Sequence, residues 1–209
     1  MKGILMKDLY IAKSNIFVAV LSLIAIGLGL SALLEPSAML TLGPAVTTVT
    51  VFLSIVSDSS SKWSKNVIAM PVSRRQIVGE KFLFYVLLAA LGLLASLLCC
   101  GALALFDVAV TSDALLLYGV IGGTASLFAG SFSLPYAFLF DPEKAEIFFI
   151  VSYLASTGII TALILFLNLF FPVKDHTILA FTLVFALSAL FYFGAYRAAA
   201  RLYQTRDVT

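Results

Sequence analysis

The segment that decides the organisation of this chain is DSSSKWSKNVIAMPVSRRQIVGEK, residues 58–81. It is the only long polar segment between apolar blocks, and it holds the single tryptophan and five of the thirteen lysine and arginine residues. A proline disfavours the helical conformation of the residue before it, so the sequence predicts a short helix over residues 62–70 that stops before Pro71. The apolar face of that helix would carry Trp63, Val67 and Met70.

A second helix is predicted after this proline. Ser73 followed three residues later by Gln76 has the form of a capping box, in which each residue's side chain accepts a hydrogen bond from the other's backbone N–H. The helix then continues into the next apolar block. The segment therefore predicts an amphipathic loop that presents an aromatic anchor among basic residues, notably Lys62, Arg74 and Arg75.

The composition of the chain excludes a water-soluble domain. Of its 209 residues, 62% are hydrophobic and only 11% are charged, and the mean hydropathy is +1.09. A helix needs about 20 apolar residues to cross a bilayer core. The sequence predicts an all-α, polytopic membrane protein, a single transmembrane domain over residues 1–209. Its six expected spans are residues 16–34, 39–57, 82–106, 114–140, 147–170 and 177–195.

The distribution of basic residues predicts the orientation of the chain. If both termini lie in the cytosol, twelve of the thirteen lysine and arginine residues fall in cytosolic segments, and only Lys174 lies outside. Short loops rich in lysine and arginine stay on the cytosolic side. Positive charge spread over such loops gives no indication of nucleic-acid binding. Residues 58–81 would then form a cytosolic loop.

Two of the predicted spans carry features that suggest a function. Thr47, Thr50 and Ser54 give the second span a hydroxyl-rich face, which could line a substrate pathway or hold helices together. In the fourth span, Gly119 and Gly123 would permit close helix approach. Pro135 predicts a kink near the cytosolic end, so these three residues could form a gate or a packed, bent helix.

The N-terminal segment mixes apolar and basic residues before the first span. Its pattern predicts a helix lying at the membrane interface, with lysines reaching to lipid headgroups. Neither this segment nor the remainder of the chain contains the glycine-rich phosphate loop of an ATPase. No catalytic constellation and no metal site is expected, because the one histidine, His176, lacks converging partners. No charged residue lies within the six apolar runs, so we expect no buried charge.

Two stretches resemble a known family. The first holds Asp58, Trp63, the run from Pro71 to Val78, and Lys81, and the second is the opening MKGILMKDLY. Both are similar to small bacterial type-2 ABC exporter permeases, including the membrane subunits of phenol-soluble modulin exporters. The resemblance implies a cell-membrane permease that pairs with a second copy or a homologue and exports an amphipathic peptide or hydrophobic compound. A separate cytosolic ATPase would supply ATP and Mg²⁺. Its docking residues would be Lys62, Trp63, Val67, Met70, Arg74 and Arg75.

Three functions are compatible with the sequence. The first is the ABC exporter permease that the resemblance implies. The second is a passive channel or secondary carrier, and the third is a non-transporting membrane protein that confers resistance by sequestering a peptide. An amphipathic cytosolic loop combined with an absence of buried charge favours the first.

Overall fold

A computed structural model describes residues 2–31, 35–61, 73–106, 110–140 and 142–205 of the chain. In these ranges the chain forms helices and no strand, and six of the helices are long and apolar enough to cross a membrane. The prediction of an all-α protein with six long apolar helices is therefore confirmed. These are α1 (Lys2–Ser31), α2 (Met39–Ser60), α4 (Arg74–Ala104), α5 (Ser112–Leu139), α6 (Ala145–Leu167) and α7 (Thr177–Thr205), with short 3₁₀ helices η1 (Pro36–Ala38) and η2 (Pro142–Lys144).

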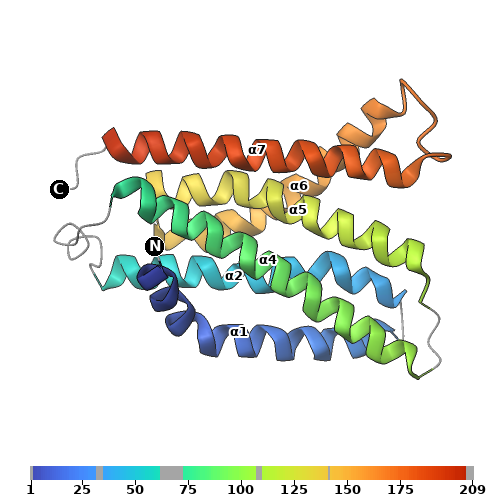
Figure 1. Cartoon of the computed structure of the whole chain (residues 1–209), viewed down its shortest axis with the longest axis horizontal. Helices are drawn as coiled ribbons and strands as arrows, with labels where there is room; N and C mark the ends of the chain where they lie inside the picture. The colour runs from blue at the N-terminus through green and yellow to red at the C-terminus, as the bar shows by residue number, and fades with distance from the viewer. Residues whose placement is uncertain (1, 32–34, 62–72, 107–109, 141, 206–209) are drawn as a thin grey trace.

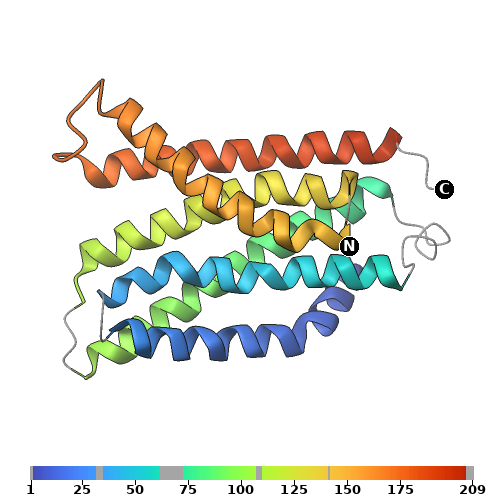
Figure 2. The ribbon, with the colours of Figure 1, turned by 180° about the vertical axis from the view of Figure 1, so that it is seen from behind.

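The six helices form one elongated bundle. Helices α2 and α5 contact each other in its middle, while α4 crosses one face (Figure 1) and α6 crosses the opposite face (Figure 2). Helices α1 and α7 lie along the two edges, and the first turns of α1 bend away from the rest of that helix (Figure 1). Helix α1 begins, and α7 ends, at the same end of the bundle.

The start of α4 follows directly from its sequence. Gln76 donates its backbone N–H to Ser73 Oγ at 3.3 Å, and Ser73 donates its backbone N–H to Gln76 Oε1 at 3.0 Å. These reciprocal bonds satisfy two N–H groups that have no partner within the helix. The predicted capping box is confirmed, so α4 begins well before the apolar run and carries polar residues into the bundle.

Helices α2 and α4 approach each other most closely at two glycines. A Cβ atom on Gly92 would lie 2.4 Å from the Gly43 carbonyl oxygen and 2.4 Å from Thr47 Oγ1. A Cβ on Gly43 would lie 2.5 Å from the Gly92 carbonyl oxygen. Only glycine allows this backbone contact, which is the usual device for packing helices in a membrane.

An aromatic cluster fills the middle of the bundle. Phe52 packs against Tyr85 and Phe149, and Tyr85 stacks on Tyr192, so α2, α4, α6 and α7 all contribute. The buried hydroxyls are paired: Tyr85 donates to the Ser126 carbonyl and Tyr192 to the Phe82 carbonyl, both at 2.8 Å. Such bonds remove the cost of burying a hydroxyl and fix the helices relative to one another.

Candidate functional site

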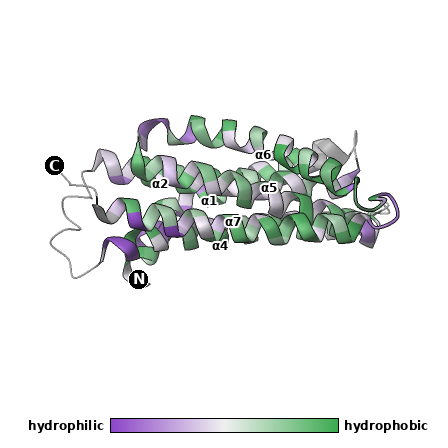
Figure 3. Ribbon diagram, turned by 90° about the horizontal axis from the view of Figure 1, so that it is seen from above, coloured by the Kyte–Doolittle hydropathy of each residue, from purple (hydrophilic) through white to green (hydrophobic). Residues whose placement is uncertain are grey.

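Five charged side chains converge at one end of the bundle, where α1 begins, α2 ends and α4 begins. They are Lys7 and Asp8 of α1, Asp58 of α2, and Glu80 and Lys81 of α4. Figure 3 shows hydrophobic colours along the middle of the helices and hydrophilic colours gathered toward their ends. The cluster therefore occupies the polar end of an otherwise apolar bundle.

Four of these residues form a closed ring of ion pairs. Lys7 Nζ lies 3.1 Å from Asp8 Oδ1 and 2.6 Å from Asp58 Oδ1. Lys81 Nζ lies 2.9 Å from Asp58 Oδ2 and also pairs with Asp8. Each lysine thus bridges both aspartates, and each aspartate bridges both lysines. We call these four residues the ion-pair ring.

The ion-pair ring is largely shielded from solvent. The exposed fraction of the side chain is 0% for Asp8 and 4% for Lys81, against 18% for Asp58 and 20% for Lys7. Lys81 Nζ also donates a hydrogen bond to the buried Ser54 Oγ at 3.0 Å. Charged side chains at this depth require partners, because an unpaired buried charge loses its hydration without compensation.

Glu80 extends the cluster on the α4 side. Its residue is only 1% exposed, and Asp8, Lys81 and Lys7 are its electrostatic neighbours. Ammonium groups lie between Asp8 and Asp58, whereas Glu80 lies beside Asp8. The described residues contain no group of three His, Cys, Asp or Glu that could hold a metal ion. The arrangement is suited to holding three helices together by charge.

The position of the ion-pair ring relates it to the polar segment that joins α2 and α4. Asp58 lies in the last turn of α2, and Lys81 lies about two turns after the first residue of α4. Residues 62–72 connect these two helix ends and lie outside the described part of the chain. The ring therefore ties both ends of that connection to each other and to the first helix.

The expectation that this protein contains no buried charge is wrong. The apolar runs are free of charged residues, but α1, α2 and α4 extend beyond those runs and bury Asp8, Glu80 and Lys81 between them. The sequence analysis assigned no role to Lys7 or Asp8 and predicted only a helix at the membrane interface for the segment that holds them. The signal that could have found the ring is the presence of opposite charges just beyond the apolar runs of three consecutive helices.

The hydroxyl-rich face of α2 is buried in this structure, as expected of a face that holds helices together, and its role as a pathway lining stays a prediction. Thr47 is fully buried and donates to the Leu88 carbonyl of α4 at 2.7 Å. Thr50 and Ser54 are also buried, and they donate to the Thr47 and Val51 carbonyls at 2.7 and 2.8 Å. Thr47 thus joins α2 to α4, and Ser54 accepts the hydrogen bond from Lys81, while the bond of Thr50 stays within α2.

The glycines of α5 divide into two kinds. Among the described residues, no atom lies within 4 Å of a Cβ on Gly119, so this chain shows no close helix approach there, whereas a Cβ on Gly123 would meet the Phe185 ring at 3.1 Å. The tightest contact of α5 is at Gly122, where a Cβ would lie 2.1 Å from the Leu40 carbonyl oxygen. Helix α5 continues through Pro135 to Leu139.

The predicted docking residues fall partly outside the described ranges. Lys62, Trp63, Val67 and Met70 belong to residues 62–72, which the structure does not describe. Arg74 and Arg75 are the first two residues of α4, and the side chain of Arg75 is exposed. The two arginines thus lie at the same end of the bundle as the ion-pair ring.

Comparison with known proteins gives one family. A family model described as an ABC-2 family transporter protein matches residues 3–204, which is nearly the whole chain. Comparison with curated proteins and with solved structures found no match.

Proposed function

This chain belongs to the ABC-2 family of transporter proteins, and on that premise we propose that it is the permease subunit of an ATP-driven exporter. A separate cytosolic ATPase subunit binds and hydrolyses the ATP with Mg²⁺. The permease lies in the bacterial cell membrane with both termini in the cytosol, and it pairs with a second copy or a homologue. Its cargo is an amphipathic peptide or a hydrophobic compound.

The observation that carries this proposal is the ion-pair ring, because Asp58 and Lys81, the first and last residues of the 58–81 segment, both belong to it. Residues 62–72 join the end of α2 to the start of α4, so a partner bound to them acts on these two helix ends. Asp58 and Lys81 join those helix ends directly, and Lys7 and Asp8 join them to α1. A displacement at the loop is thereby passed to three membrane helices.

The proposed cargo follows from the polarity of the membrane interior. The six apolar runs carry no charged residue, and the ion-pair ring neutralises its own charges at one end of the bundle. A small hydrated ion would lose its water shell along the spans without gaining a ligand. An amphipathic or hydrophobic compound avoids that cost, so it is the favoured cargo.

The test is reconstitution of the purified chain in liposomes with and without a candidate ABC ATPase subunit that co-purifies with it. With the ATPase present, a labelled amphipathic peptide should move in an ATP-dependent way, and the peptide should stimulate ATP hydrolysis. A variant ATPase that binds but cannot hydrolyse ATP provides the matched control. If the peptide moves equally fast with the active ATPase and with the variant that cannot hydrolyse ATP, the proposal is contradicted.

The buried carboxylates support a second candidate function, that of a secondary carrier. Asp8 and Glu80 lie side by side in the bundle, and buried carboxyl groups are the usual sites of proton coupling in carriers. In liposomes without the ATPase, a carrier would move the peptide in response to an imposed proton gradient. An ABC permease would stay inactive until the ATPase and ATP are added.

A further inference from the structure

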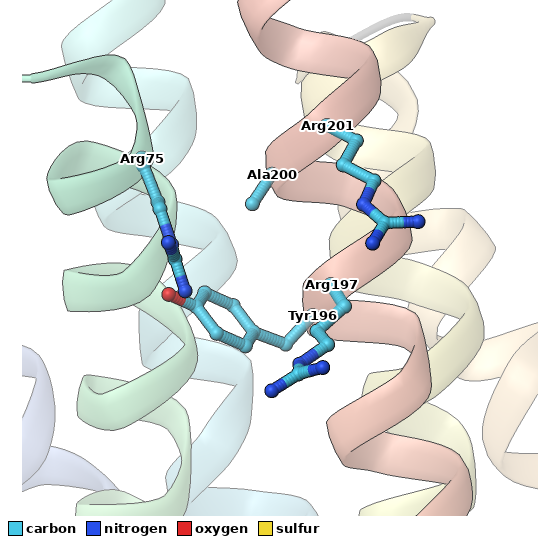
Figure 4. A pocket seen from close by; sticks show the side chains of 5 residues that line it. All are labelled: Arg75, Tyr196, Arg197, Ala200 and Arg201. Atoms are coloured by element: carbon cyan, nitrogen blue, oxygen red, sulfur yellow. The ribbon is translucent and has the colours of Figure 1, made fainter.

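A second polar feature lies at the same end of the bundle, between the start of α4 and the end of α7. It is a cavity of about 360 Å³, separate from the ion-pair ring. Arg75 reaches across from α4 toward the Tyr196 ring, while Arg197 and Arg201 project from α7 (Figure 4). Ala200 lies between the arginines of α7 and leaves room beside them.

The arginines of this cavity are not neutralised in the way that the lysines of the ion-pair ring are. Within the described ranges, no ion pair joins Arg75, Arg197 or Arg201 to an acidic side chain. The guanidinium of Arg197 lies over the Phe193 ring at 4.8 Å, which orients it without cancelling its charge. Arg75 of α4 and Arg197 of α7 therefore bring positive charge to one cavity, and Arg201 also lines it while its side chain projects away from Arg75 (Figure 4).

The cavity lies where polar and apolar surfaces meet. One turn before Arg197, Phe193 is 52% exposed, and Leu190 before it is 71% exposed. On α4, Leu83 follows Arg75 by about two turns and is 47% exposed. Outward-facing apolar side chains on membrane helices contact acyl chains, so the arginines lie at the height of the lipid headgroups.

We propose that this cavity binds the headgroup of an anionic phospholipid. Guanidinium groups hold phosphate oxygens through two parallel hydrogen bonds, and the Tyr196 hydroxyl lies beside them as a further donor. Basic pockets between transmembrane helices on the cytosolic side are suited to such headgroups. The positive-inside rule accounts for arginine on this side of the membrane, but not for three of them around one cavity.

The occupant is a lipid rather than a soluble phosphate because of what surrounds the site. A free anion would use only the guanidinium groups, whereas a lipid also covers exposed apolar surface, including Phe193 beneath Arg197. Binding would link α7 to the start of α4, and through Lys81 to the ion-pair ring. The composition of the inner leaflet would thereby influence the helices that carry the loop.

The test is titration of the purified full-length chain in neutral detergent with phosphatidylglycerol, phosphatidylcholine or inorganic phosphate. The melting temperature is followed at each concentration. Phosphatidylglycerol should raise it by several degrees in a saturable way, and neither phosphatidylcholine nor inorganic phosphate should do so. Arg75→Gln, Arg197→Gln and Arg201→Gln should each weaken the apparent affinity about fivefold, which corresponds to the roughly 1 kcal/mol expected for one basic residue at a lipid surface.

Lys13→Gln is the matched control. Lys13 is exposed in the N-terminal part of α1, and its substitution removes one positive charge from the protein, as each arginine variant does. Its affinity for phosphatidylglycerol should equal that of the wild type. If any arginine variant elutes abnormally, the corresponding lysine variant replaces it and should bind with intermediate affinity.

Three results would overturn the proposal. An equal effect of inorganic phosphate would mean a soluble anion site, and equal loss in Lys13→Gln would mean attraction by net charge alone. No response to phosphatidylglycerol, combined with loss of ATPase co-purification in the arginine variants, would assign these arginines to the ATPase interface.

Discussion

Lys81 is the residue on which the ion-pair ring depends most. It is buried, it pairs with both Asp8 and Asp58, and it donates to Ser54. Its alkyl chain crosses apolar surface before the ammonium group reaches the carboxylates. Methionine can replace the volume of that chain but leaves two carboxylates facing each other with only Lys7 between them.

Lys81→Met should therefore destabilise the folded protein by about 3–5 kcal/mol, because removing one partner of a buried pair strands the other. The measurement is the melting temperature in detergent, followed by fluorescence-detected gel filtration. The double variant Lys81→Met/Asp8→Asn should melt above the value expected from adding the two single effects. Lys13→Met, on the exposed side of α1, should change little, and additive losses in the double variant would contradict the pairing.

At the scale of the elements, glycine decides how closely helices approach. Gly92 lies at the α2–α4 crossing, where a Cβ would meet two oxygen atoms at 2.4 Å. Gly119 of α5 has no atom within 4 Å of the corresponding position. The same substitution should therefore act in opposite directions at these two positions.

Gly92→Ala should lower the melting temperature, since the helices must separate and lose the Thr47 hydrogen bond to Leu88. Gly119→Ala should leave it unchanged or raise it slightly, because alanine favours a helix over glycine by about 1 kcal/mol. Both melting temperatures are measured in the same detergent. A tolerated alanine at Gly92 would mean that the two backbones do not meet there.

The elements were predictable from sequence because their signals are local. Six uncharged runs gave six helices, and the Ser73–Gln76 spacing gave the start of α4. The ion-pair ring was not predictable in the same way, since Asp8, Asp58 and Lys81 are far apart in sequence and lie just outside the apolar runs. Their pairing depends on how far each helix extends and on which face it turns inward. The surroundings of Gly119 could not be predicted for the same reason.

At the scale of the whole molecule, the orientation in the membrane remains a prediction from the basic residues. Single cysteines at Glu35, Ser112 and Lys174, which are exposed positions in or beside the connections at one end of the bundle, should react with an impermeant thiol reagent on intact cells. A cysteine at Ser60, at the other end of α2, should react only after the cells are opened. The unmodified chain, with Cys99 and Cys100, gives the background. Labelling of the Ser60 cysteine on intact cells would show that the orientation in the membrane is the opposite of the predicted one.

The proposed role of the loop requires separate tests of ATPase binding and of transmission. Trp63 has the character of a buried anchor on a polar segment, and such anchors contribute about 2 kcal/mol or more to an interface. Trp63→Ala should weaken ATPase binding about thirtyfold, which corresponds to that energy, while the protein still inserts in the membrane. Arg74→Ala should have a smaller, salt-sensitive effect. Wild-type ATPase affinity in Trp63→Ala would leave the tryptophan as a membrane anchor only.

Asp58→Asn tests transmission, because it loosens α2 from the ion-pair ring without removing the docking residues. Lys7 and Lys81 both keep Asp8 as a partner, so α1 and α4 stay joined and the folding cost should be smaller than for Lys81→Met. The ATPase should bind normally and hydrolyse ATP, but the amount of peptide exported per ATP should fall severalfold. Asp113→Asn, an exposed acid in the first turn of α5 at the opposite end, should export normally. Unchanged export per ATP in Asp58→Asn would show that movement of the loop reaches the helices by another route, and that the ion-pair ring serves stability alone.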